Sequence, residues 1–335
     1  MRYFKILALM LGLVLFAWIV RQIGLAELQQ GFRRLGWNLL WPVIIISPGY
    51  FLYTLSWQLF LKRFEHHPVG FWTLFRIKVA GEATNTLTPL NFAGGDPIRV
   101  WLLSKRIPVA IGGASVVVDR TLHSLAIATL VCLGNLAAVI LLEFPGWARV
   151  MLGLTSTLMA LLVFFLLFQQ TRGLFQKLFR LLSRLRLKKV SEETWQQLAE
   201  LDQHLHDFYR QDRPLFLFCF SLHFLSRLIG IVEIIVIARL LGVPMGIGEG
   251  VFFAAVIPMT NLLGALVPGT FGVMEGVVSS LFVALRWSAA DGLVLQIVRR
   301  LRAGCWILLG LSFILLERPP KGGRSPLDSG RWFGK

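Results

Sequence analysis

Residues 112–142 read GGASVVVDRTLHSLAIATLVCLGNLAAVILL, an apolar run of 31 residues. An α-helix rises 1.5 Å per residue, so about 20 apolar residues cross the hydrocarbon core of a bilayer. Five further runs are apolar and long enough to be spans: 4–20, 38–61, 150–169, 214–238 and 293–316. The sequence therefore predicts an all-α fold, a polytopic membrane helix bundle with about six full spans.

Composition excludes a water-soluble globular protein. Of the 335 residues, 56% are hydrophobic and 16% are charged, whereas roughly 25% are charged in soluble domains. The net charge of +16 does not indicate nucleic acid, because the basic residues lie in loops between apolar runs, where they can also attract anionic lipid head groups. Cys132, Cys219 and Cys305 lie inside apolar runs and are expected to be small buried hydrophobes. We expect no disulfide, metal or cofactor.

The distribution of Lys and Arg predicts the orientation in a bacterial inner membrane. With the N-terminus in the cytoplasm, 23 of the 34 basic residues lie on the cytoplasmic side. Both termini and the helical loop 171–213 are then cytoplasmic, and a helix is expected to start at Ser191. The run 4–20 lacks a small-residue cleavage site, which favours an uncleaved first helix. The membrane domain is expected to cover 1–316, followed by a disordered tail, 317–335.

Two apolar regions, 70–97 and 247–285, are broken by Gly, Pro and Asn. The first contains GEATNTLTPLNFAGGD at 81–96, and the second contains NLLGALVPGTFGVMEG at 261–276. In both, an Asn precedes a proline, and an acid follows that proline by seven residues with glycines between. The residues are Asn85, Pro89, Gly94, Gly95 and Asp96 in the first region, and Asn261, Pro268, Gly269, Gly272 and Glu275 in the second.

This pattern predicts a helix–break–helix element in each region. Proline ends the incoming helix, glycine permits a reversal, and an acid favours the positive dipole end of the outgoing helix. With six full spans, the two regions enter the membrane from opposite faces, as in the inverted repeat of a transporter. Each element can also be read as a capped turn alone. The matched spacing favours two segments that line a substrate pathway, with tips meeting near the bilayer midplane.

Charged residues inside the third span are costly and are therefore expected to be paired or functional. Asp119 and Arg120 lie early in this span. They can pair with each other, or across the protein with Asp96 or Glu275. Alternatively, Arg120 contacts a lipid head group.

The fifth and last spans also carry charges. Glu233 lies near mid-membrane and is either a proton or counter-ion site or a salt-bridge partner of Arg227 or Arg299. His223 shares a helix face with Arg227, four residues on. The last span opens with Arg299, Arg300 and Arg302. Three such residues cannot all share one face, so at least one is expected to face the interior, where a guanidinium suits a phosphate.

Three stretches carry a resemblance to a known family: NTLTPLNFAGGDPIRVWLLSKR at 85–106, VVVDR at 116–120 and VPGTFGVMEG at 267–276. They resemble the flippase-like membrane domain of lysyl-phosphatidylglycerol synthases, over roughly 5–316. The resemblance implies a lipid-flipping or lipid-handling domain with re-entrant segments. It also matches the Asp-Arg pair and a basic residue on the last span. The bifunctional synthases carry a soluble aminoacyl-transferase domain; only nineteen residues follow 316 here, so lysyl transfer is not expected.

The leading interpretation is a lipid transporter or flippase that moves an amphipathic phospholipid or hopanoid-type lipid between leaflets without ATP hydrolysis. One alternative is a non-transporting membrane subunit of a lipid-modifying or glycosyl-transfer enzyme. Another is a membrane-embedded transferase using Asp119, Glu233 or Glu275. No Walker loop, HExxH motif or nucleophile–base set appears, so we expect no enzyme. The expected partners are a lipid substrate, the bilayer, and either a second copy of the chain or a lipid-biosynthetic enzyme.

The predicted topology can be tested by cysteine accessibility. Single cysteines at positions 143 and 191, in a variant without the three native cysteines, should be labelled from opposite sides of the membrane, because the intervening run 150–169 is a full span. Labelling of both from the same side would contradict the topology.

Overall fold

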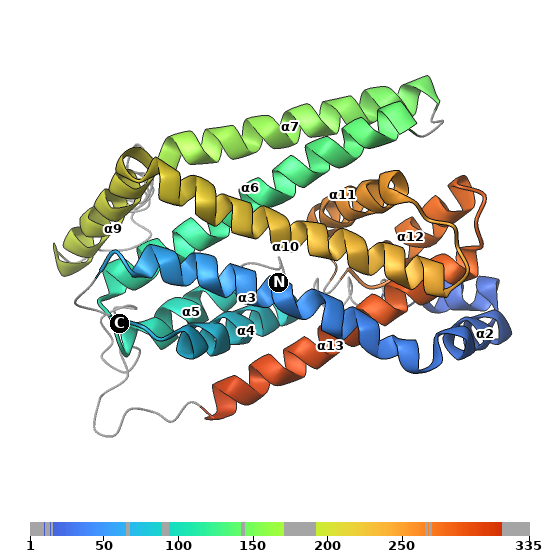
Figure 1. The fold of residues 1–335 in the computed structure, drawn as a ribbon, viewed down its shortest axis with the longest axis horizontal. Coiled ribbons are helices and arrows are strands. Elements are labelled where there is room, and N and C mark those ends of the chain that lie inside the picture. Colours follow the sequence, from blue (N-terminus) through green and yellow to red (C-terminus); the bar gives the residue numbers. More distant parts are fainter. Residues whose placement is uncertain are drawn as a thin grey trace.

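The computed structural model describes residues 10, 14, 16–64, 68–88, 94–141, 145–170, 192–264, 267 and 270–316. Within these residues the fold is all-helical. The elements are α2 (Leu25–Leu35), η1 (Gly36–Leu40), α3 (Trp41–Leu61), α4 (Phe71–Leu87), α5 (Gly95–Ser104), α6 (Val109–Leu141), α7 (Gly146–Gln170), α9 (Glu192–Gln211), α10 (Arg213–Leu240), α11 (Ile247–Leu263), α12 (Val273–Ala284) and α13 (Ala289–Leu316). They form an elongated bundle in which the long helices lie side by side along the long axis of the molecule (Figure 1).

The predicted membrane bundle is confirmed in its main features. Among the described residues, four stretches are long and apolar enough to cross a bilayer: Leu25–Leu61, Val109–Leu141, Gly146–Phe165 and Arg213–Leu240. The predicted span 293–316 forms most of α13, a 28-residue helix that carries three arginines near its middle. Most of the predicted span 4–20 and the tail 317–335 lie outside the described residues, as does the first half of the loop 171–213.

Two apolar clusters occupy the two ends of the bundle. One joins the end of α3, the start of α4, the end of α5 and the start of α6, through Phe60, Leu74 and Leu103 among others. The other joins α2, the ends of α10 and α12, and the starts of α11 and α13, through Leu241, Phe253 and others. α4 therefore starts, and α5 ends, at one end of the bundle, whereas α11 starts and α12 ends at the opposite end (Figure 1).

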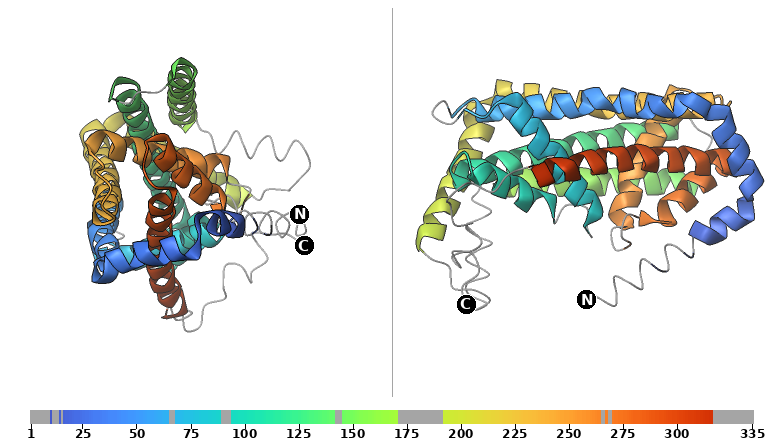
Figure 2. Two further views of the ribbon diagram at one scale, coloured as in Figure 1. Left: turned by 90° about the vertical axis from the view of Figure 1, so that its right-hand side faces the viewer. Right: turned by 90° about the horizontal axis from the view of Figure 1, so that it is seen from below.

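The helices fall into two quartets with matching contacts, α3–α6 and α10–α13. The last helix of each quartet packs on the second helix of the other: α6 packs on α11, and α13 packs on α4. Within each quartet the third helix packs on the last: α5 packs on α6, and α12 packs on α13. The leading helices, α3 and α10, pack on each other. They are antiparallel, because Ser56 contacts Cys219 whereas Gly49 faces Ser226. The pattern is that of two inverted units around the α3–α10 pair, which the views in Figure 2 show side by side.

Glycines set the distance between the quartets. A Cβ added to Gly310 on α13 would lie 2.5 Å from the carbonyl oxygen of Val79 on α4, and one added to Gly134 on α6 would lie 2.8 Å from that of Val251 on α11. Only glycine permits this approach of the backbones.

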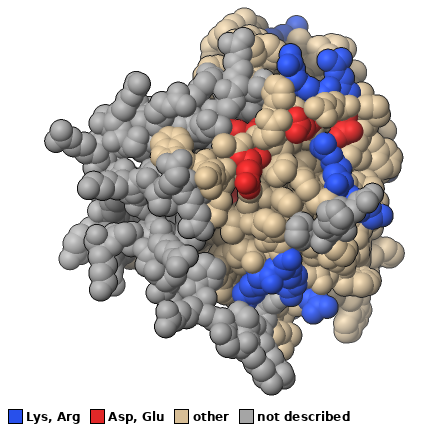
Figure 3. Space-filling view, turned by 90° about the vertical axis from the view of Figure 1, so that its left-hand side faces the viewer, with Lys and Arg blue, Asp and Glu red and all other residues tan. Residues whose placement is uncertain are grey.

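The remaining helices differ from the quartets. α7 packs mainly along α6 and leaves most of its apolar side chains exposed, as expected beside lipid. α9 begins at Glu192, next to the predicted start, and lies at the end of the molecule seen in Figure 3, where the acidic side chains gather between separate basic ones. Of the three cysteines, only Cys219 is buried as expected; Cys132 is partly buried and Cys305 is exposed on α13, so the expectation for Cys305 is wrong.

The close packing of α13 on α4 predicts opposite effects for one substitution at two sites on α13. Gly310→Ala should lower the free energy of unfolding by about 1–3 kcal/mol, because its Cβ overlaps α4 backbone. Gly304→Ala should be neutral or raise it by up to about 1 kcal/mol, since nothing lies within 4 Å and alanine favours a helix. Unfolding in detergent micelles measures both; equal effects would refute the packing.

Candidate functional site

The first break joins α4 and α5 through their polar ends. α4 ends at Leu87 and α5 begins at Gly95, whose N–H donates to Asn85 Oδ1 at 2.8 Å. A Cβ on Gly95 would lie 2.0 Å from the carbonyl oxygen of Gly81, so the close approach of these helices requires glycine. Asp96 lies in the first turn of α5, as the sequence predicts.

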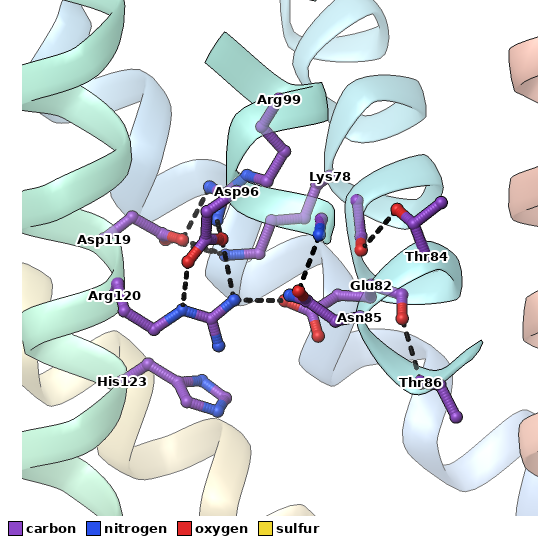
Figure 4. A network of polar contacts seen from close by, with 12 residues as sticks. Lys78, Glu82, Thr84, Asn85, Thr86, Asp96, Arg99, Asp119, Arg120 and His123 are labelled. Carbon is purple, nitrogen blue, oxygen red and sulfur yellow. Dashed lines mark hydrogen bonds and ion pairs between the residues drawn. The ribbon is translucent and has the colours of Figure 1, made fainter. Parts of the chain in front are cut away.

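Asp96 is held by Arg120 of the next helix. Arg120 donates from Nε to Asp96 Oδ2 at 2.9 Å and from Nη2 to Oδ1 at 2.7 Å, a two-bond pair. Glu82 Oε1 lies 3.9 Å from the same Nη2. Figure 4 shows the Arg120 side chain between these two acids, with His123 farther along α6. The side chains of Asp96 and Arg120 remain 21% and 25% exposed, so a ligand can reach this pair.

A closed ion-pair cluster lies behind Asp96. Asp119 accepts from Lys78 Nζ and from Arg99 Nη2, each at 2.6 Å, and His223 Nε2 is 3.4 Å away. These four side chains are at most 3% exposed. They connect α4, α5, α6 and α10, so their role is to fix the helices that carry the exposed pair.

The second break has a similar construction between α11 and α12. Thr270 Oγ1 donates to Asn261 Oδ1 at 3.3 Å. Gly272 adopts φ 77°, which favours glycine, and its N–H donates to Glu275 Oε2 at 2.9 Å in the first turn of α12. Arg300 of the next helix, α13, binds both oxygens of Glu275 and also the Thr270 carbonyl at 3.2 Å.

The two breaks therefore share the same plan of contacts. Each has an Asn on the incoming helix that binds the outgoing segment, and an acid in the first turn of the outgoing helix. Each acid is bound by an arginine of the following long helix, 24 residues after Asp96 and 25 residues after Glu275. Three residues of the predicted breaks lie outside the described residues: Pro89, Pro268 and Gly269. Gly94 is described and is the N-cap of α5.

The other two arginines of α13 bind the fully buried Glu233 of α10. Arg302 Nη1 donates to Glu233 Oε2 at 2.7 Å, and Arg299 Nε lies 3.5 Å from the same oxygen. Of the alternatives for Glu233, pairing with Arg299 is thus confirmed and pairing with Arg227 is wrong. All three arginines contact buried acids, which agrees with the expectation that at least one faces the interior. α13 packs on both α10 and α12, so its arginines divide between two acids.

Arg227 has no carboxylate partner among the described residues. Its Nη2 lies 2.9 Å from His123 Nε2, and its guanidinium lies 5.6 Å from the centre of the Tyr53 ring. With Arg227, these clusters contain seven Lys or Arg side chains and five Asp or Glu side chains. We call this set the polar layer, because most of it lies between the two apolar end clusters. Its surplus of positive charge favours an anionic ligand.

Several members of the polar layer were missed at the level of sequence. Lys78 and Arg99 belong to the 23 basic residues counted on the cytoplasmic side, but both are at most 1% exposed, so they are buried inside the bundle and are not exposed loop charges. Their spacing, Lys78 to Glu82 and Asp96 to Arg99, places opposite charges one helical turn apart and was the available signal. Asp119 and Arg120 do not pair with each other; Arg120 pairs with Asp96 instead.

Comparison with known proteins places these features in a family context. The family described as "Lysylphosphatidylglycerol synthase TM region" matches residues 5–311. A curated relative, a "UPF0104 membrane protein" of Methanothermobacter thermautotrophicus, is 27% identical over 169 residues. That alignment covers 50% of this chain and about half, 49%, of the relative. No solved structure matches the chain.

The closed cluster predicts a large difference between two Asp→Asn substitutions. Asp119→Asn removes the carboxylate that binds Lys78 and leaves Arg99 with its 3.4 Å contact to Asp96, so it should lower the free energy of unfolding by about 3–5 kcal/mol. Asp291→Asn, which breaks the partly exposed pair with Arg34, should lower it by at most about 1 kcal/mol. Thermal or denaturant unfolding of the purified variants measures both; similar losses would exclude a supporting role for Asp119.

Proposed function

The chain belongs to the lysylphosphatidylglycerol synthase TM region family, and on that premise we propose that it moves an amphipathic lipid between the two leaflets of a membrane without ATP hydrolysis. The polar layer binds the head group, and the apolar tail of the lipid stays in the bilayer. The sequence has no Walker loop, so an ion gradient or the downhill supply of lipid drives the movement.

The arrangement of the two breaks supports this proposal. α4–α5 and α11–α12 start from opposite ends of the bundle, and each places an Asp or Glu at the start of a helix inside it. Broken helices with this inverted arrangement form the substrate sites of many secondary transporters, because the unwound backbone offers polar groups at membrane depth. A lipid head group that passes from one break to the other would therefore cross the hydrocarbon core of the bilayer while it contacts the charged groups at the two breaks.

The strongest support for the proposal is that the polar layer is partly accessible and has a surplus of positive charge. Arg120 and Arg300 are 25% and 23% exposed while they bind Asp96 and Glu275. A phosphate of a head group can replace either carboxylate, since a guanidinium binds both anions through the same two-bond geometry. Arg227, which contacts His123 but no carboxylate among the described residues, and the surplus of cations favour an anionic head group over a cationic one.

Reconstituted protein should speed the exchange of a fluorescent phospholipid between vesicle leaflets. Asp96→Asn and Glu275→Gln each weaken the ion pair that positions Arg120 or Arg300, and each should slow exchange about tenfold or more, an effect of at least ~1.4 kcal/mol on the barrier. Asp212→Asn is a matched control, because it removes a carboxylate paired with Arg63 outside the polar layer, and it should leave the rate unchanged.

Two outcomes would contradict the proposal. If the wild-type protein does not exchange lipid but copurifies with a lipid-modifying enzyme, the chain is a non-transporting subunit. If Asp96→Asn and Glu275→Gln lower only the yield of folded protein, with normal exchange by the folded fraction, the two ion pairs are structural.

A further inference from the structure

The surplus of positive charge in the polar layer is concentrated on α10 and α13. At the second break one arginine faces one acid, and at the first break one arginine faces two acids. The closed cluster around Asp119 has one cation more than it has acids. Among the described residues, the remaining part has three arginines and a single acid, a surplus of two. Its members, which we call the α10–α13 group, are Arg227, Glu233, Arg299 and Arg302.

The arginines of the α10–α13 group converge on α3. Trp306 follows Arg302 by one turn on α13 and stacks on Tyr50 of α3, with ring centres 4.1 Å apart. Tyr53 follows Tyr50 by one turn, and the guanidinium of Arg227 lies 5.6 Å from the centre of its ring. The glutamate of the group connects both sides, because it lies on α10 with Arg227 and binds Arg302 of α13. The two arginines therefore flank one pair of tyrosines.

The α10–α13 group is continuous with both breaks. His123, which Figure 4 shows beyond Arg120, lies three residues after it on α6, and its Nε2 is 2.9 Å from Arg227 Nη2. At the second break Arg300 binds Glu275, and its neighbours along α13 belong to the group. A head group that leaves one break therefore meets the α10–α13 group before it reaches the other.

Hydrogen-bond donors exceed acceptors at this position. Arg227 Nε, Arg302 Nε and Trp306 Nε1 are buried and donate to no described residue, whereas a single acceptor of the group, Glu233 Oε1, lacks a donor. Donors without acceptors are costly inside a protein. The side chain of Arg302 is 17% exposed and Arg227 is half-buried, so a ligand can reach both guanidiniums. The chemistry that fits is an anion with several acceptor oxygens.

We propose that the α10–α13 group is the resting site of the head group and that it selects lipids with a phosphate monoester. This assignment rests on the proposed function. A phosphate monoester carries about −1.5 to −2 charges at pH 7, which matches the surplus of two. The phosphodiester of phosphatidylglycerol carries only one negative charge, and phosphatidylcholine has no net charge. Arg227 and Arg302 hold the phosphate oxygens from two helices, and the breaks are the positions through which the head group enters and leaves.

The test measures how tightly phosphatidic acid, phosphatidylglycerol and phosphatidylcholine bind to delipidated full-length protein in detergent, by native mass spectrometry. Phosphatidic acid should bind most tightly and phosphatidylcholine most weakly. Arg227→Gln and Arg302→Gln should each weaken the binding of phosphatidic acid about tenfold or more, because hydrogen bonds to charged groups contribute at least that much to affinity. Arg227→Lys should weaken it less than Arg227→Gln, since the charge is kept.

Thermal unfolding of the lipid-free protein separates binding from folding. Arg227 has no carboxylate partner among the described residues, so Arg227→Gln should leave Tm unchanged or raise it, because one of three neighbouring cations is removed. A lower Tm with unchanged affinity for phosphatidic acid would assign Arg227 a structural role and overturn the proposal.

Arg33→Gln is the matched control, since Arg33 is exposed on α2 outside the polar layer. It should leave the binding of phosphatidic acid unchanged, and equal weakening would show diffuse attraction to basic residues and overturn the proposal. Phosphatidylglycerol that binds as tightly as phosphatidic acid would overturn it as well. Inorganic phosphate that displaces phosphatidic acid at equal concentration would do the same, because the site would then take free phosphate.

The vesicle exchange assay distinguishes this inference from the proposed function. If the wild-type protein exchanges lipid but shows no preference for phosphatidic acid, the resting site is wrong and transport stands. If phosphatidic acid binds in an Arg227-dependent way but no lipid is exchanged, the site stands and transport is wrong.

Discussion

An ionised carboxylate inside a membrane protein requires a cation within reach, and this requirement organises the centre of the structure. Asp96, Asp119, Glu233 and Glu275 each contact at least one Arg or Lys of another helix. Removing one partner of such a pair costs several kcal/mol, because the remaining charge is left without water. The ion pairs thus decide which helices can be neighbours, while the apolar clusters at the two ends fill the space that the charges leave.

The same requirement explains why two interrupted helices are stable within the bundle. A break in a helix leaves N–H and C=O groups without partners, and in lipid these groups must be satisfied by the protein itself. Asn85 accepts a hydrogen bond from the N–H of Gly95, and Asn261 accepts one from the hydroxyl of Thr270. The Glu275 carboxylate accepts a hydrogen bond from the N–H of Gly272. The N–H groups of Gly95 and Gly272 are therefore satisfied by side chains at the breaks, and the Glu275 carboxylate is in turn neutralised by Arg300.

Much of this architecture could be predicted from the sequence. The apolar runs predicted the long helices, and the spacing of Pro89 and Pro268 from the two acids predicted outgoing helices with an acid in the first turn. Partners distant in sequence could not be predicted: Lys78 and Arg99 bind Asp119, 41 and 20 residues away, and a count of basic residues along the chain treats them as loop charges. The division of three adjacent arginines between two acids depends on helix packing that periodicity alone does not contain.

The two halves of the protein are built alike but are not in the same state. Asp96 is 21% exposed, whereas its counterpart Glu275 is fully buried. The first break therefore presents both members of its ion pair to a ligand, whereas the second presents only the Arg300 guanidinium, which is 23% exposed.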